Sequence, residues 1–132
     1  MTQYDTLEYS KIEVADGLLE SFEEPGYTYL HCTYTTSPMY VAGWWVNIYK
    51  TSYLIGKDGE RLPLLHVLNI PFAPEKHYLK RFGDVLRFTL IFPAVPTDWV
   101  VFDFIEHCID VTGLSILNIV RNNTGVYKVT IS

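Results

Sequence analysis

The chain has 132 residues, a length that fits one domain with its own hydrophobic core. A hydrophobic share of 48% against 19% charged residues excludes an intrinsically disordered chain. The formal net charge is -5 and the ten Lys and Arg residues are scattered, which excludes nucleic-acid binding because phosphate backbones require clustered cations.

The N-terminal segment contains no recognisable targeting signal. Residues 1–21 combine no basic leader with an apolar stretch, and no apolar run in the chain approaches the roughly 20 residues of a membrane-spanning helix. We therefore expect a cytoplasmic protein with no membrane span. If a leader has been removed, the location would be extracytoplasmic.

The first predicted elements are two strands. A strand over residues 7–14 is preferred to a short helix near Leu18, because Gly17 weakens a longer helix. After the Pro25-Gly26 turn signal, residues 27–36 alternate and are rich in Tyr and Thr, as in a strand. The face of this strand with Cys32 is predicted to line the core, and the face with His31 is predicted to meet solvent.

Residues 40–54 form the next predicted strand, which has large side chains on both faces. We predict that one of Trp44 and Trp45 is buried and that the other is partly exposed. A hairpin then turns at Asp58-Gly59, joining residues 53–55 to residues 61–65. Pro63 cannot donate a ladder hydrogen bond, so we place it at a sheet edge.

The irregular sequence of residues 65–82 predicts a loop region with one short strand at 67–70. The basic side chains in and beside this region, with His77, are read as solvated surface more readily than as a site for an acidic ligand. Exposed aromatic residues can nevertheless stack on sugars or anchor peptides. The candidate ligand-binding residues are Trp45, Tyr49, His77 and Tyr78.

Residues 86–106 supply two apolar strands around a connection bounded by Pro93 and Pro96. Strict alternation puts Asp103 and Glu106 on opposite faces of the second strand, so they are poor candidates for a paired general acid and base. The same alternation puts Val100, Phe102 and Phe104 on one face and Val101, Asp103 and Ile105 on the other. Two further strands, at 114–120 and 125–132, complete the chain.

The two cysteines each follow a histidine, as His31-Cys32 and His107-Cys108. Adjacent residues of a strand point to opposite faces, and the close ligand pairs of a zinc site are absent. Buried free thiols are the preferred interpretation. A disulfide between the two cysteines is the alternative, although a cytosolic setting disfavours it.

Together these patterns predict a single all-β domain over residues 1–132, an antiparallel β-sandwich of immunoglobulin-like or jelly-roll-like type with about seven to nine strands. Several segments also resemble a group of small β-sandwich domains of unassigned function in Bacteroidota, often attached to exported thioredoxin-like proteins. The resemblance spans residues 27–119 and rests mainly on Gly43-Trp44-Trp45 and on the Phe-Asp-Phe-Ile-Glu run at 102–106. It implies the sandwich fold and brings no catalytic motif.

No phosphate loop, nucleophile elbow or metal-binding motif occurs in the chain. We therefore expect a protein that is not an enzyme and uses no cofactor or metal. The leading hypothesis is a binding or assembly module for a protein partner or a second copy of itself. The alternative is a small-ligand or carbohydrate binder that uses the exposed aromatics and the loop at 66–82. An enzyme built on His31, His107 and the acidic residues is a third hypothesis.

Overall fold

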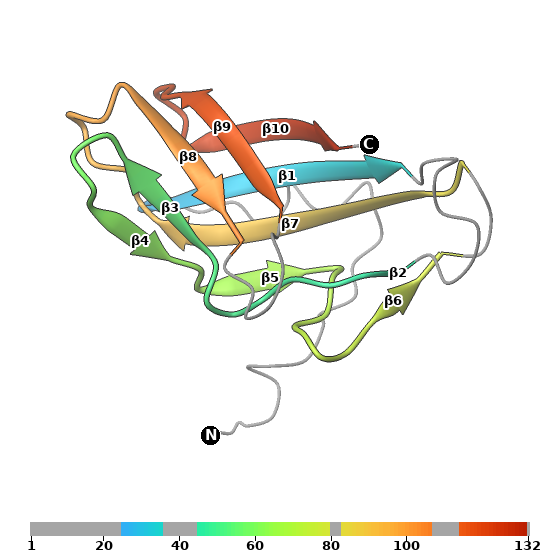
Figure 1. Ribbon diagram of the computed structural model, residues 1–132. Coiled ribbons are helices and arrows are strands. Elements are labelled where there is room, and N and C mark those ends of the chain that lie inside the picture. The colour runs from blue at the N-terminus through green and yellow to red at the C-terminus, as the bar shows by residue number, and fades with distance from the viewer. Residues whose placement is uncertain (1–24, 36–44, 80–82, 107–113, 132) are drawn as a thin grey trace.

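The computed structural model describes residues 25–35, 45–79, 83–106 and 114–131. Over these residues the chain forms ten β-strands and no helix (Figure 1). The strands are β1 (Tyr27–Thr35), β2 (Trp45–Val46), β3 (Tyr53–Gly56), β4 (Arg61–Pro63), β5 (His66–Leu68), β6 (His77–Tyr78), β7 (Val85–Pro93), β8 (Val101–Ile105), β9 (Ser115–Val120) and β10 (Val126–Ile131).

The all-β prediction is confirmed for the described residues, and the predicted strand at 7–14 lies outside them. The expected count of seven to nine strands was too low. The predicted loop at 65–82 contains β6 as well as β5, and β6 pairs with β2 as a separate two-stranded ribbon. No helix within the described ranges is long and apolar enough to span a membrane.

The strands form three sheets, with the orders β10-β1-β7-β5, β4-β3-β8-β9 and β2-β6. The two long strands β1 and β7 pair in register from Tyr27 opposite Pro93 to Thr35 opposite Val85. The purely antiparallel arrangement that we predicted is wrong at one position, since β10 pairs with β1 in parallel. The connection after β9 leads β10 into the other four-stranded sheet, where it runs alongside β1 in the same direction (Figure 1).

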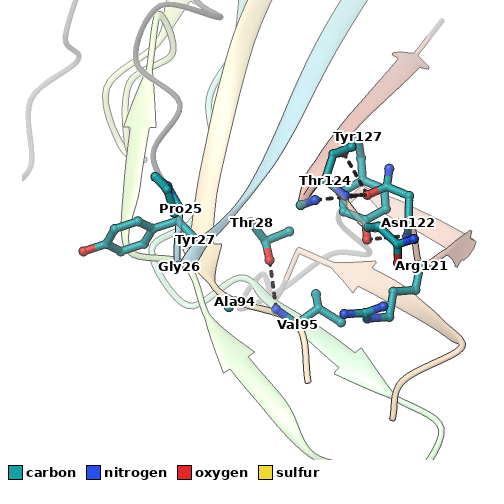
Figure 2. A pocket seen from close by; sticks show the side chains of 12 residues that line it. Pro25, Gly26, Tyr27, Thr28, Ala94, Val95, Arg121, Asn122, Thr124 and Tyr127 are labelled. Carbon is teal, nitrogen blue, oxygen red and sulfur yellow. Dashed lines mark hydrogen bonds between the residues drawn. The ribbon is translucent and has the colours of Figure 1, made fainter. Parts of the chain in front are cut away.

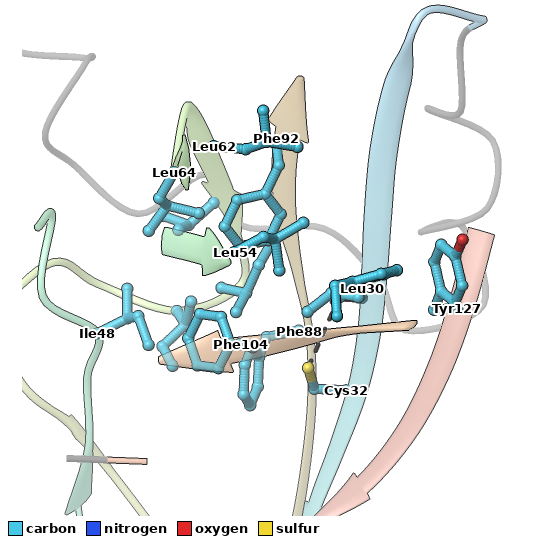
Figure 3. Close-up of a cluster of buried hydrophobic side chains, with 14 of the residues drawn as sticks. Leu30, Cys32, Ile48, Leu54, Leu62, Leu64, Phe88, Phe92, Phe104 and Tyr127 are labelled. Atoms are coloured by element: carbon cyan, nitrogen blue, oxygen red, sulfur yellow. Dashed lines mark hydrogen bonds between the residues drawn. The ribbon is translucent and has the colours of Figure 1, made fainter. Parts of the chain in front are cut away.

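One hydrophobic cluster takes side chains from both four-stranded sheets (Figure 3). Leu90 and Phe92 of β7 are fully buried on one side, and Phe104 of β8 is fully buried on the other. The rings of Phe92 and Phe104 meet edge to face with centroids 6.0 Å apart. The two apolar runs of the 86–106 stretch therefore belong to different sheets, and the connection between them crosses from one sheet to the other.

The hairpin between β3 and β4 forms as predicted. Leu54 lies opposite Leu62 in the register, and Gly59 adopts a φ of 89° at the turn. The Asp58 carboxylate accepts a hydrogen bond from the backbone N–H of Glu60 at 2.9 Å. Pro63 lies on β4, the edge strand of its sheet, so its missing N–H leaves no gap in the ladder.

One burial prediction is wrong. His31 is buried, and its Nδ1 lies 2.7 Å from Oγ1 of the fully buried Thr89. The His31 ring stacks on the Tyr29 ring. Tyr29 belongs to a second apolar cluster, and this cluster lies on the face of the β10-β1-β7-β5 sheet opposite to Leu30 and the main core. This sheet thus buries side chains on both faces along β1. Val100 is exposed because it precedes β8, at a bend where strand alternation does not apply.

Candidate functional site

The β2-β6 ribbon brings together three of the four candidate ligand-binding residues. Trp45 lies directly opposite Tyr78, and Val46 lies directly opposite His77. Since opposite residues of an antiparallel pair share a face, Trp45 and Tyr78 form one side of the ribbon. That side meets solvent, with 44% of Trp45 and 60% of Tyr78 exposed, whereas Val46 packs against the main core.

Several contacts hold this ribbon in place. The Asn47 side chain donates a hydrogen bond to the Glu75 carbonyl at 2.9 Å, and Ile48 forms a parallel bridge with Phe72. The ammonium group of Lys76 lies 4.5 Å from the centroid of the Trp45 ring, a cation–π distance. The exposed ribbon face therefore presents two aromatic rings with one cation.

Tyr49, the fourth candidate ligand-binding residue, contributes a backbone contact to Glu106. Its backbone N–H donates a hydrogen bond to Oε2 of Glu106 at 3.2 Å, and the Leu114 N–H donates to Oε1 at 2.9 Å. Burial raises the pKa of Glu106, and these two hydrogen bonds offset part of that rise. Glu106 thus fastens the segment after β2 and the start of β9 to the end of β8. None of these contacts joins Tyr49 to the aromatic ribbon.

Asp103, the second carboxylate singled out in the sequence, also has structural contacts. Oδ1 of Asp103 accepts the Asn118 N–H at 2.8 Å, and its Oδ2 lies 3.9 Å from the Lys57 ammonium. His107 and Cys108 lie outside the described residues. Among the residues that the structure does describe, no cluster of three or more His, Cys, Asp or Glu side chains is arranged to hold a metal ion.

Cys32 is a buried free thiol in the main core, so the disulfide alternative finds no support. Burial raises its pKa to about 12, which leaves the thiol protonated at neutral pH. Its Sγ lies 3.7 Å from the Leu30 carbonyl oxygen, a weak hydrogen bond. A thiol in this state is a packing group and a poor nucleophile.

A second candidate site is a pocket of about 270 Å³ at the end of the molecule where β1 begins (Figure 2). Three connections line it, and they come from distant parts of the sequence: residues 25–28, 94–95 and 121–127. Among the described residues that line it, Arg121 alone is charged. Sequence reasoning missed this pocket, because a single arginine beside a turn carries no recognisable spacing.

A third feature is the outer face of the β4-β3-β8-β9 sheet. Val101 lies directly opposite Val120, and the neighbouring pair Phe102 and Ile119 faces the core. Val120 is 69% exposed and Leu117, also on β9, is 60% exposed. This sheet therefore presents apolar side chains to solvent along its β9 side.

Comparison with protein-family models, with curated proteins and with solved structures found no match to this chain. The resemblance to the Bacteroidota β-sandwich domains consequently stays a prediction. The three surface features described above are the basis for assigning a function.

Proposed function

We propose that this chain is a non-enzymatic β-sandwich module that binds a protein partner or a second copy of itself. The observation that carries the proposal is the exposed apolar surface on β9, where Leu117 and Val120 meet solvent and Val120 lies opposite the half-buried Val101 of β8. Contiguous apolar patches on a protein surface mark interaction sites more often than isolated apolar residues do.

The sandwich, of immunoglobulin-like or jelly-roll-like type, is part of the same proposal. Ring contacts between the two four-stranded sheets support it. Besides the contact of Phe92 with Phe104, the Phe102 ring of β8 meets the Tyr127 ring of β10 edge to face at 5.4 Å. Two sheets with interdigitating inner faces and solvent-facing outer faces are the general arrangement of a sandwich.

The contact is proposed to use the face of β9 and not its free edge. The register of β9 against β8 shifts between Phe102 and Phe104, and Asn118 adopts a φ of 61°. Its N–H points to the Asp103 carboxylate. Such a bulge interrupts the row of backbone groups to which another strand could add, so edge-to-edge pairing is disfavoured.

Sedimentation velocity over a range of concentrations tests the self-association branch, and affinity isolation with identification of the recovered protein tests the partner branch. Leu117→Asp and Val120→Asp are expected to abolish the association. Val85→Asp is the matched control, since Val85 is an exposed apolar residue on a strand of the other sheet. A strict monomer that recovers no partner would refute the proposal, as would equal loss in all three variants.

A second candidate function is binding of a carbohydrate or another small ligand, and the cross-strand pair of Trp45 and Tyr78 favours it. Two exposed rings on one face provide a surface on which a sugar ring can stack. A glycan array tests this function, with Trp45→Ala compared against Val85→Ala, a change of an exposed apolar residue outside both the ribbon and the pocket. Binding that survives Trp45→Ala would exclude the ribbon as the ligand site.

A further inference from the structure

The pocket at the start of β1 contains one cation, Arg121, for which the described residues supply no counter-charge. The Nε atom of Arg121 is buried and has no hydrogen-bond acceptor, and within the described part of the chain the guanidinium forms no ion pair. Its backbone is fixed, because the Arg121 N–H donates to the Val100 carbonyl at 2.9 Å. Figure 2 shows the side chain extending from this point toward Val95.

Two buried hydroxyl groups line the same pocket and keep their protons available. Oγ1 of Thr28 accepts the Val95 N–H at 3.0 Å, and the Tyr127 hydroxyl oxygen accepts the Asn122 N–H at 3.0 Å. Each hydroxyl therefore acts as an acceptor in these bonds, while its own O–H is free to donate. Together with the Arg121 guanidinium, the pocket lining therefore carries three groups that can donate hydrogen bonds.

Three backbone amides of the neighbouring turn, those of Asn122, Thr124 and Gly125, already donate hydrogen bonds within the protein. Oδ1 of Asn122 accepts hydrogen bonds from the N–H groups of Thr124 and Gly125 at 3.0 Å each, and also from the Thr124 hydroxyl. A phosphate site usually uses several free backbone N–H groups or several cations to balance its charge. Among the described residues this pocket has one cation and a turn in which three amides are already used, which suits a single negative charge.

We propose that this pocket binds a carboxylate group, with Arg121 as its charged partner and the Thr28 and Tyr127 hydroxyls as additional donors. A carboxylate is an acceptor-only group of charge minus one, and it can accept two hydrogen bonds side by side from a guanidinium. The pocket volume of about 270 Å³ lies just below the range for drug-sized ligands. The ligand is therefore a small carboxylic acid or the C-terminal carboxylate of a peptide.

The test is a titration followed by two-dimensional ¹H–¹⁵N NMR at about pH 6, where carboxylic acids are ionised. The Arg121 Nε–H signal is observed directly. Propionate and N-acetylalanine, which presents the carboxylate of a peptide end, are each compared with their uncharged amides. Saturable shifts of Arg121 Nε–H and of the Val95 amide are expected with the acids only. Whichever acid binds more tightly identifies the source of the carboxylate.

Variants locate the binding. Arg121→Gln is expected to weaken it about tenfold or more, because it removes a charge-assisted hydrogen bond. Lys128→Gln removes one positive charge from an exposed position on β10 outside the pocket lining and should leave binding unchanged. Equal loss in both variants would overturn the proposal and indicate non-specific charge attraction.

Titrations of the wild-type protein alone can also overturn the proposal, whether or not the Arg121→Gln variant folds. Equal shifts with acid and amide, or shifts that do not saturate, would overturn the carboxylate assignment. Tighter binding of inorganic phosphate than of propionate would overturn it as well, since the argument from the occupied turn amides would then fail.

Discussion

The contact between Gly56 and Trp99 allows a sharp test of the core. A Cβ atom built on Gly56 would lie 2.5, 2.7 and 2.9 Å from three ring atoms of Trp99. The indole ring is buried and also contacts Phe102, with centroids 6.0 Å apart, so it has little room to move away. Gly56→Ala should therefore destabilise the protein by steric overlap, by about 1–3 kcal/mol, the usual cost of overpacking a core.

A second substitution separates this overlap from other effects of removing a glycine. The Trp99 Nε1–H is buried and has no hydrogen-bond partner, so Trp99→Phe loses no hydrogen bond while it reduces the size of the ring. In the Trp99→Phe background, Gly56→Ala should cost clearly less than in the wild type. The difference between the two costs is the coupling energy of the pair, which we expect to be about 0.5–3 kcal/mol.

Urea unfolding followed by far-ultraviolet circular dichroism measures these free energies, because the signal comes mainly from the backbone and remains measurable when Trp99 is replaced. Gly59→Ala is the comparison, because that position has a φ of 89° and no atom within 4 Å of the added Cβ. Its cost comes from the backbone alone and should not depend on Trp99. An equal cost of Gly56→Ala in both backgrounds would refute the packing argument.

Three further predictions concern buried polar groups. Thr89→Val removes the hydroxyl 2.7 Å from His31 Nδ1 and should cost about 1–3 kcal/mol in unfolding free energy; a solvent-facing His31 would predict no change. In a Cys108→Ser background, Cys32 should react with a thiol reagent only after denaturation, because it is buried and its pKa is about 12; fast labelling of the native protein would contradict this. Because burial raises the pKa of Glu106, the folded state binds more protons than the unfolded state above the usual glutamate pKa. Between the usual glutamate pKa and the raised pKa of Glu106, the free energy of unfolding should therefore fall as pH rises, and Glu106→Gln should flatten this part of the pH profile. An unchanged profile would show that another group titrates there.

Local patterns predicted the strands well where only one face of a strand is buried. On β8, Phe102 and Phe104 face the core while Asp103 does not, as the alternation indicated. The Asp58-Gly59 turn was also predictable, since a turn that needs positive φ favours glycine. In both cases the information lies within a few residues.

The same reasoning failed for His31 because β1 is an inner strand buried on both faces. Period-two alternation states which residues share a face, but it does not state whether the other face is covered. Polar residues such as Thr28, His31 and Thr89 then resemble surface positions although all three are buried. Their burial becomes clear only when the cross-strand partner of each is known.

The order of the strands likewise could not be predicted from the sequence, and this order decides which candidate residues lie side by side. The ribbon that joins Trp45 to Tyr78 depends on pairing between segments more than 30 residues apart, which neither segment encodes by itself. Tyr49 was grouped with them because it is near Trp45 in sequence and aromatic. Its backbone instead holds Glu106, a contact that alternation does not predict.

The carboxylate pocket follows from the sheet crossings and not from any motif. The connections from β7 to β8 and from β9 to β10 both pass between the two four-stranded sheets, and both line the pocket beside the start of β1. Figure 1 shows this end of β1 on the left of the molecule and the β2-β6 ribbon on the right. The contacts described for Arg121 and Trp45 involve different residues, so the effects of their substitution on the free energy of unfolding should add. The two candidate sites can therefore be tested separately, and failure of one leaves the other intact.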